Sequence, residues 1–528
     1  MESDTSSTQR PVIQASEILA KIERGEPVEY DGVIVEGDLD ISELDLPTEH
    51  VDRTEPEFRS GLSEVLKVVR SQITITNSEI RGKVNFSNAR VQEPINFSLT
   101  KFTGRNADFM GAEFSGNAYF GISKFTGGDT NFGRAKFTGG SADFMGAEFG
   151  GNAYFWDAEF GGNAYFWDAE FGGNASFSDA EFGGDTNFRR AKFTGRDAIF
   201  VGAKFTGGNV YFEEAEFGGN AYFGDAEFGG DTNFRRAKFT GRHAYFWEAE
   251  FGGDAYFEEA EFGGGAYFES AKFTGGYAYF EGAKFDVVLN IDNIKFNRLY
   301  ITWESIKDRL IYSGPVYLAL IKNFKVIERF NDADDCYYAY RKESQTQKKW
   351  YSEKNRLIDF LIRGYNWIST TIKRISEYFG WINNYPPFTW IHRFNWSKLL
   401  DCLGFVSCGY GVRIQPIILW VLGSVLGFTL LYKLLPQSYG GIAESGPSTV
   451  TMEAVNNSTL LLTFSSGDGA VSPSWGECLY FSFTALTGGT PDGLHPVGLV
   501  KYAVMIEGVL GYLFLALFVV VLARKIIR

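Results

Sequence analysis

A short pattern, Ala-x-Phe, recurs from about residue 107 to residue 285 and constrains this chain more than any other feature. Ala153-Tyr154-Phe155 and Ala158-Glu159-Phe160 are examples, and their spacing alternates near 5 and 6 residues, which gives a period of about 11. Alanine and phenylalanine two positions apart point to the same side of an extended chain, and the residue between them points outward. The pattern therefore predicts short strands around an apolar interior.

A repeat of 11 residues is also compatible with a right-handed helical supercoil. Glycine pairs argue against a helix, because Gly150-Gly151 and Gly161-Gly162 recur nearly every period and each glycine costs about 1 kcal/mol in a helix interior. Turns in a coiled extended chain require glycine at the corners. We therefore expect a coiled β-structure.

The order of charges along the repeat predicts the length of one turn, because the residue inside every second motif is charged. If stacked neighbours were one period apart, about 7 of 15 pairs would have opposite signs, whereas about 11 of 14 do at two periods. Opposite charges on neighbouring strands are favourable, so one turn should take about 22 residues and four motifs. The charged residues are Glu113, Lys124, Lys136, Glu148, Glu159, Glu170, Glu181, Lys192, Lys204, Glu216, Glu227, Lys238, Glu250, Glu261, Lys272 and Lys284.

Four inward Ala/Phe steps per turn resemble the pentapeptide-repeat family over roughly residues 75–297. The resemblance implies a right-handed quadrilateral β-helix. Every second unit departs from the family pattern by an extra residue, often glycine, which we interpret as a bulged corner. About eight turns at ~4.8 Å would give a rod of about 40 Å with a stacked phenylalanine core. Outward tyrosines such as Tyr154 and Tyr222 either mark a partner surface or cover strand edges.

Composition divides the rest of the chain into three segments. Residues 1–74 should form an N-terminal capping segment with a short helix and irregular first strands. Residues 298–412 contain the helical patterns Asp332–Lys349 and Asn355–Phe379, followed by an aromatic stretch over 380–396. They are either a helical, partly interfacial linker or a small subdomain on the end of the rod. Residues 413–528 form the last segment.

Two apolar runs in this last segment, Ile414–Leu435 and about Val497–Leu522, are each long enough to cross a bilayer. Between them, a shorter amphipathic stretch ends in Gly, Thr, Pro and Asp. Non-helical backbone at membrane depth persists only where protein buries it or water lines it. The order of span, half-buried helix, loop and span therefore indicates a pore in a lipid bilayer.

Basic residues predict the orientation of the spans. Arg413 and several other basic residues precede the first span, Arg524, Lys525 and Arg528 follow the second, and residues 436–496 contain neither Lys nor Arg. The positive-inside rule then places both termini in the cytoplasm of a two-span, multi-pass protein of the cell membrane.

Leu479–Thr487 resembles the pore helix of two-span potassium-type channels, and Gly508–Arg524 resembles their inner helix. Cys408-Gly-Tyr-Gly-Val-Arg413 resembles a stretch of channel-fused pentapeptide-repeat proteins. In potassium channels the carbonyls of Thr-Val-Gly-Tyr-Gly replace the hydration shell of K⁺. Here the corresponding residues are Gly488, Gly489, Thr490, Pro491 and Asp492, and we include Thr487, which precedes them, in the predicted filter.

These departures from the channel motif change the expected selectivity. Pro491 fixes φ and removes a donor, and Asp492 near an outer mouth would attract cations. We therefore expect a weakly selective pore for monovalent cations in a homotetramer, since the resemblance implies four subunits. The alternative is that Thr490–Gly493 is a tight turn in a non-conducting loop.

Two residues of the second span have two interpretations each. Glu507 is an intramembrane carboxylate, which either braces the pore helix or attracts ions. Gly511 is either a gating hinge or a site of close helix packing.

Several functions are disfavoured by the sequence. The four histidines have no ligand spacing, and neither a phosphate-binding loop nor a nucleophile elbow is present, so we expect no enzyme, cofactor or metal site. A net charge of −15 argues against nucleic-acid binding. We expect an ion channel whose cytoplasmic β-helix serves in assembly, tethering or sensing, with a possible cytoplasmic protein partner. The alternative is a non-conducting, membrane-anchored scaffold.

Overall fold

The computed structural model describes residues 10–55, 58, 61–348, 396–435, 442–444, 449–456, 459–465, 473–489 and 494–526. The chain forms two compact units, Met1–Cys336 and Tyr337–Arg528. The predicted helix Asn355–Phe379, the aromatic residues 380–395 and the predicted filter residues Thr490, Pro491 and Asp492 lie outside the described residues.

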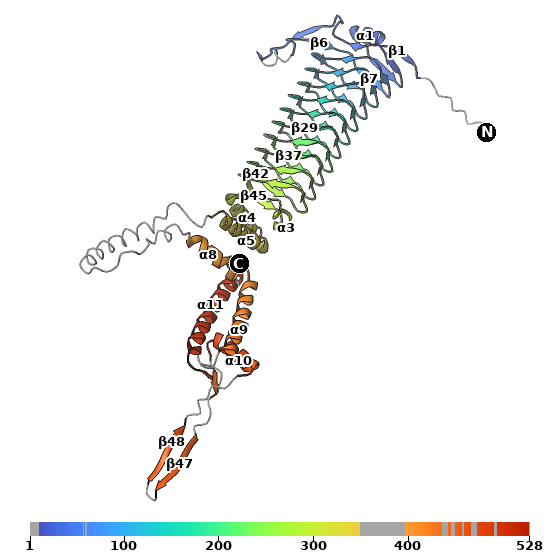
Figure 1. Ribbon diagram of the computed structural model, residues 1–528. Helices are drawn as coiled ribbons and strands as arrows, with labels where there is room; N and C mark the ends of the chain where they lie inside the picture. The colour runs from blue at the N-terminus through green and yellow to red at the C-terminus, as the bar shows by residue number, and fades with distance from the viewer. Residues whose placement is uncertain are drawn as a thin grey trace, which may run out of the picture. The chain divides into compact units, whose positions relative to one another are not determined.

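The first unit is a β-solenoid whose strands run from β1 (Val12–Gln14) to β45 (Lys295–Tyr300), as Figure 1 shows. One turn consists of β20 (Glu148–Phe149), β21 (Ala153–Tyr154), β22 (Glu159–Phe160) and β23 (Ala164–Tyr165). The next turn begins at β24 (Glu170–Phe171), where Glu170 pairs in parallel with Glu148, 22 residues earlier. The predicted turn of four motifs and about 22 residues is therefore confirmed.

The solenoid has about 12 turns, because one column of parallel strands holds 12 members from β1 to β43 (Lys284–Phe285). The prediction of about eight turns was wrong, since β3 (Ile34–Glu36) and its neighbours already stack beneath the repeat. These first strands contain Val and Ile in place of Ala-x-Phe. Helix α1 (Ala15–Glu23) buries Ile18 and Ile22 beside them. Twelve turns correspond to a length of about 50 Å.

The stacking of the turns agrees with the one that the charge pattern predicted. All 14 pairs of charged residues two periods apart are neighbours in the strand register, and 11 have opposite signs. Lys192 contacts Glu170 at 2.8 Å, and Lys284 contacts Glu261 at 2.7 Å. Such exposed pairs add little stability, so their main effect is on register.

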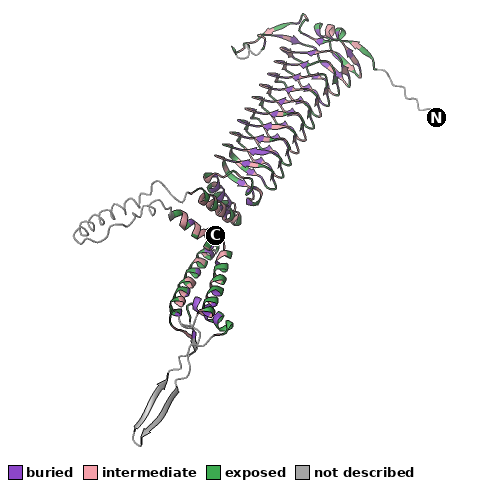
Figure 2. Ribbon diagram, in the orientation of Figure 1, coloured by how far each residue is buried: buried purple, intermediate pink, exposed green. Residues whose placement is uncertain are grey.

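Stacked phenylalanines form the core, as predicted. Figure 2 shows buried residues, in purple, along the turns of the solenoid. Phe155 stacks on Phe177 of the next turn at 4.8 Å with an interplanar angle of 2°. Phe155 meets Phe166 of the adjacent column edge to face, at 5.4 Å and 87°. Aromatic rings pair favourably in both geometries. The phenylalanine rings therefore pack against rings in adjacent turns and in the adjacent column.

The corners of the solenoid differ from the prediction that its turns need the glycine pairs for their backbone conformation. At the tight corners most of the left-handed residues are not glycine; Asp157, for example, has a φ of 54°, whereas Gly146 occupies such a corner with a φ of 65°. The glycine pairs instead lie where backbones of successive turns approach closely. A Cβ on Gly173 would lie 2.4 Å from the carbonyl oxygen of Gly151. Glycine is needed at these wider corners for space, not for a positive φ.

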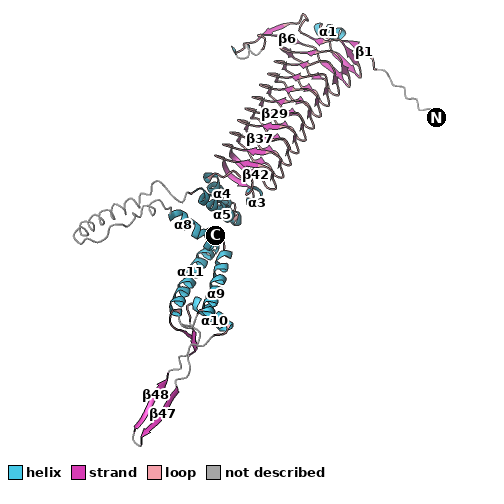
Figure 3. Ribbon diagram, in the orientation of Figure 1, coloured by secondary structure: helices cyan, strands magenta, loops and turns pink. Residues whose placement is uncertain are grey.

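Helices follow β45, the last strand of the solenoid, as Figure 3 shows. They are α3 (Trp303–Ile306), α4 (Gly314–Val326) and α5 (Phe330–Gln347). The buried side chain of Asn323 in α4 accepts a hydrogen bond from the N–H of Leu299 (3.1 Å) and donates one to its carbonyl (2.7 Å). The side chain thus satisfies backbone groups at the edge of β45 that pair with no further strand in the described part of the chain. Helix α5 covers most of the predicted pattern Asp332–Lys349.

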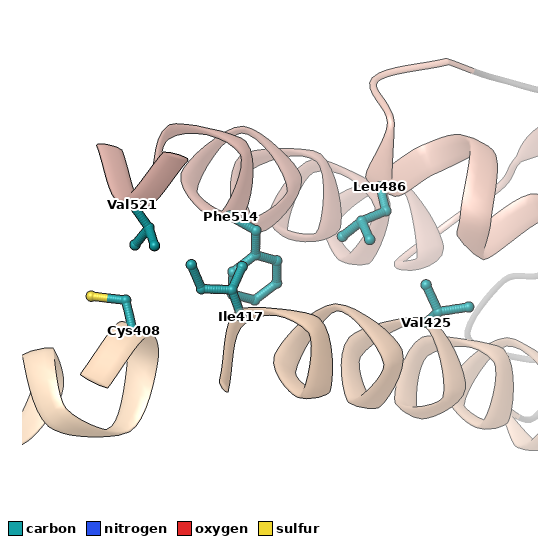
Figure 4. Packing of buried hydrophobic residues seen from close by; sticks show 6 residues of the cluster. All are labelled: Cys408, Ile417, Val425, Leu486, Phe514 and Val521. Atoms are coloured by element: carbon teal, nitrogen blue, oxygen red, sulfur yellow. The ribbon is translucent and has the colours of Figure 1, made fainter. Parts of the chain in front are cut away.

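The second unit contains α8 (Trp396–Cys408), the 3₁₀ turn η1 (Gly409–Gly411), α9 (Gln415–Leu434), α10 (Trp475–Leu486) and α11 (Val500–Ile526). Helices α9 and α11 are long and apolar enough to cross a membrane. Their bounds agree with the two predicted apolar runs. Figure 4 shows Ile417 of α9 and Phe514 of α11 between the two helices, with Leu486 of α10 in the same cluster.

Candidate functional site

The predicted pore helix is α10, a helix of 12 residues that contacts both α9 and α11. Its N-terminus is a capping box, in which Ser474 Oγ accepts the N–H of Glu477 at 3.2 Å. The Glu477 carboxylate accepts the N–H of Ser474 at 2.6 Å. Twelve residues measure about 18 Å, against about 30 Å for the hydrocarbon core of a bilayer. Helix α10 can therefore reach only part of the way through a membrane.

The C-terminus of α10 contains the first three predicted filter residues. Gly489 donates its N–H to the carbonyl of Thr484 at 2.8 Å, and Gly488 donates to Ala485 at 3.1 Å. Gly488 has a φ of +84°. These two hydrogen bonds and the left-handed glycine form a Schellman motif, with Thr487 as the C-cap. Gly488 and Gly489 thus end the helix, and the prediction that their carbonyls face ions stays a prediction.

Two glycines of α11 allow the backbone at the C-terminal end of α10 to pack directly against this helix. A Cβ on Gly511 would lie 1.7 Å from the carbonyl oxygen of Leu486, and one on Gly508 would lie 3.7 Å from that of Ala485. The backbone of α10 therefore rests directly on Gly511, and any larger residue there would displace it. This geometry favours the close-packing interpretation of Gly511.

Glu507 is fully buried and connects all three helices. Tyr432 of α9 donates its hydroxyl to Glu507 Oε2 at 2.5 Å, and Ser482 of α10 donates to Oε1. The ring of Tyr432 also packs edge to face against Phe481, at 5.4 Å and 88°. A buried carboxylate requires such partners, since burial without them is costly. The contacts are those expected of a brace behind α10.

An apolar groove of about 430 Å³ lies beside the end of α10. Thr487 and Tyr512 line it together with Ile418 of α9 and Phe518 of α11. Several neighbouring apolar side chains are exposed: Leu419 is 68% exposed, Met505 67% and Val509 68%. Apolar surface of this extent requires lipid or other protein to cover it.

Residues between α9 and α10 form a hairpin that the sequence analysis did not predict. Strands β47 (Thr449–Asn456) and β48 (Thr459–Ser465) pair antiparallel, and β46 (Ile442–Glu444) pairs with β49 (Leu494–Pro496). Alternation of Thr and apolar residues before a short polar turn was the signal available in the sequence. The β46–β49 pair connects the chain after α9 to the chain before α11.

The Cys408-Gly-Tyr-Gly stretch forms a left-handed turn. Gly409, Tyr410 and Gly411 have φ values of 53°, 60° and 80°. Burial, with a smaller contribution from Asp401, raises the pKa of Tyr410 to about 12. Its hydroxyl therefore stays protonated and donates to Gln345 Oε1 of α5 at 2.7 Å. The turn thereby holds α5 beside the start of α9.

Further contacts join the last part of α5 to α8 and α11. The Arg413 guanidinium lies 3.8 Å from the centroid of the Tyr338 ring, and that of Arg524 lies 4.5 Å from Tyr337. Asp401 of α8, only 7% exposed, pairs with Arg341 and with Lys348. Cations over aromatic rings and charge pairs of this kind attract. The C-terminal end of α11 is thus in contact with the linker helix.

Sequence reasoning identified Glu507 but not its partners Tyr432 and Ser482, because these lie 75 and 25 residues away. The capping box of α10 was visible as Ser474-x-x-Glu477. Among the described residues, no group of three or more His, Cys, Asp or Glu residues could hold a metal ion.

Comparison with known proteins identifies the repeat. A family model described as pentapeptide repeats (9 copies) matches residues 75–121, 166–215, 212–261 and 246–293. The solenoid of this chain is therefore built from pentapeptide repeats. No curated protein and no solved structure matches the chain.

Proposed function

We propose that this chain is a subunit of a cation channel, anchored in the cell membrane by α9 and α11. The observation that carries the proposal is α10: a capped helix, too short to span, packed between two apolar helices and tied to both through Glu507. Irregular backbone following such a helix is stable at membrane depth only beside protein or water. Basic residues outside the spans support cytoplasmic termini.

One chain has too few spans to enclose a path for ions, so the proposed channel is a homotetramer. The exposed apolar side chains of α9 and α11, such as Leu419 and Val509, supply surface for neighbouring subunits and lipid. In the tetramer, Thr487 to Asp492 would line the path, and four Asp492 carboxylates would attract monovalent cations.

The solenoid supplies the cytoplasmic part of the proposed channel, in the right-handed quadrilateral form that pentapeptide repeats imply. Its role is assembly, tethering or sensing through a protein partner, without nucleic-acid binding or catalysis. The contacts of Tyr337 with Arg524 and of Tyr338 with Arg413 support coupling, because they connect the linker helix to α11 and to the residues just before α9.

A non-conducting scaffold is the second candidate, and a specific observation favours it. Gly488 and Gly489 use their N–H groups to end α10. The next residues include Pro491, which restricts the backbone further. A loop of this kind could be a closed turn instead of a filter.

Recording from purified full-length protein in planar bilayers separates the two candidates. We expect cation current from the wild-type protein, and Asp492→Asn should lower the conductance about two- to tenfold, because a ring of charges concentrates cations at the mouth. Asp468→Asn, which removes a carboxylate before α10 in the segment that joins the two apolar helices, serves as the control. Absence of current from the wild-type protein in any monovalent salt would support the scaffold.

A further inference from the structure

A groove of about 1060 Å³ runs along one glycine corner of the solenoid. It crosses four turns, beside β29 (Asp197–Ile199), β33 (Asn220–Tyr222), β37 (His243–Tyr245) and β41 (Gly265–Tyr267). Figure 1 labels β29 and β37. The four strands stack in parallel, about 4.8 Å apart, so the groove extends for about 14 Å along the solenoid.

The groove begins where a ladder of polar side chains ends. In earlier turns of this corner, the side chain of Asn152 accepts the N–H of Asn174 at 2.9 Å, and Asn174 accepts the N–H of Asp197 at 3.2 Å. The next turn has Asn220 at this place, and the two turns after it have His243 and Gly265. The carboxylate of Asp197, the only acidic residue lining the groove, accepts a hydrogen bond from Asn220 Nδ2 at 3.1 Å.

Positive groups in the groove lack partners within the part of the chain that the structure describes. The guanidinium groups of Arg196 and Arg242 are exposed and form no hydrogen bond or ion pair there, whereas elsewhere on the solenoid Arg190 pairs with Asp168 at 2.7 Å. The Nδ1 atom of His243 is shielded from solvent and also has no hydrogen-bond partner. Unpaired polar atoms in a hollow indicate a place for a complementary ligand.

We propose that this groove binds an extended acidic peptide segment of a partner protein. Arg196 and Arg242 lie two turns apart, about 10 Å along the solenoid. Acidic residues three positions apart in an extended polyproline II segment lie on the same face, about 9 Å apart. A guanidinium binds a carboxylate through two parallel hydrogen bonds, so two such pairs fix the direction and register of the peptide.

A peptide fits these observations better than a nucleic acid does. The groove offers two arginines on a chain of net charge −15, whereas binding to a phosphate backbone needs many cationic contacts. The inference deepens the tethering role proposed for the solenoid and rests on it, but not on ion conduction.

Fluorescence anisotropy with full-length protein in detergent tests the proposal. The probe is a fluorescein-labelled Gly-Ser-Glu-Gly-Ser-Glu-Gly-Ser peptide, and its glutamine counterpart is the reference. We expect saturable binding of the glutamate peptide only, weakened about tenfold by the double substitution Arg196→Gln/Arg242→Gln. The control, Arg190→Gln/Arg236→Gln, removes two exposed arginines outside the groove and should bind like the wild type.

Three results would overturn the proposal: no binding to the wild type, equal binding of both peptides, or equal affinities of the two double variants. Tighter binding of an oligothymidylate than of the glutamate peptide would also overturn it, in favour of a nucleic-acid site. Bilayer recording of the same preparation is independent, since peptide binding without current would refute only the channel.

Discussion

Gly218 and Gly219 are neighbours in one corner of the solenoid, yet their surroundings differ. A Cβ on Gly219 would lie 1.7 Å from the carbonyl oxygen of Arg196 in the previous turn, whereas one on Gly218 would lie 3.4 Å from that of Phe193. Neither glycine has a left-handed φ. Space between stacked backbones therefore decides which of the two must be glycine.

We predict that Gly219→Ala destabilises the solenoid by about 2 kcal/mol, because overpacked backbone has to move. Gly218→Ala should change stability by no more than about 0.5 kcal/mol, since alanine also lowers the entropy of the unfolded chain. Hydrogen exchange of β29 and β33 measures the local effect. Equal exchange rates in the two variants would show that close stacking is not the reason for the glycine.

Asp143 occupies a corner position at which other turns have asparagine. Its carboxylate accepts the N–H of Met145 at 2.9 Å, as Asn131 does for Gly133 at 3.0 Å. Burial raises the pKa of Asp143 above its ordinary value of 3.8, although the bond from Met145 opposes the shift. The protonated form therefore favours the folded state below pH 3.8, and this contribution is lost as the pH rises through the raised pKa.

Asp143→Asn should therefore stabilise the protein at neutral pH, by about 1 kcal/mol or less because water still reaches the half-buried side chain. The difference from the wild type should disappear near pH 3. Thermal unfolding at both pH values measures it, and Asn131→Asp should show the opposite sign. A stabilisation that is independent of pH would exclude burial of charge as its cause.

Among the helices, Glu507 is the contact that joins α9, α10 and α11. If it acts as a brace, Glu507→Gln should keep most of the stability, because an amide oxygen still accepts a bond and a hydroxyl can also accept. Glu507→Ala should cost about 3 kcal/mol, because the buried hydroxyl of Tyr432 loses its carboxylate partner and that of Ser482 retains only the carbonyl of Val425. Thermal unfolding of the purified protein measures the order of stability of these variants. Tyr432→Phe, which removes one of the two hydroxyl partners, should lie between Glu507→Gln and Glu507→Ala.

The outcome for Glu507→Gln also tests the alternative role. A stable glutamine variant whose conductance falls as far as that of the alanine variant would contradict the brace and support ion attraction. Retained conductance in the glutamine variant would support the brace.

The sequence predicted elements whose patterns are local or periodic. The order of charges from Glu113 to Lys284 predicted the strand register, and the lengths of the two apolar runs predicted α9 and α11. The first turns were missed because strands such as Ile34–Glu36 lack the Ala-x-Phe pattern. The role of the glycine pairs was also missed, since a contact between Gly173 and Gly151 depends on the neighbouring turn. Partners of Glu507 are likewise set by packing, which no spacing in the chain encodes.

For the protein as a whole, the channel proposal depends on the number of copies that assemble. One chain supplies two apolar helices and one short helix, and side chains such as Leu419 and Met505 are about two-thirds exposed on it. Burying such surface between subunits is favourable only if several copies meet. With a chain mass of 59.0 kDa, a homotetramer has a protein mass of about 236 kDa.

We therefore predict that native mass spectrometry of the detergent-solubilised protein gives a main species of four chains. Substituting Leu419 and Met505 by alanine tests how much of that assembly depends on the apolar surface, because each truncation removes up to about 2 kcal/mol of burial where the side chain is covered. Lipid-facing side chains should tolerate the change and interface residues should not. A protein that is monomeric both in detergent and in lipid nanodiscs could not enclose a path for ions, and the non-conducting scaffold would then be the better account.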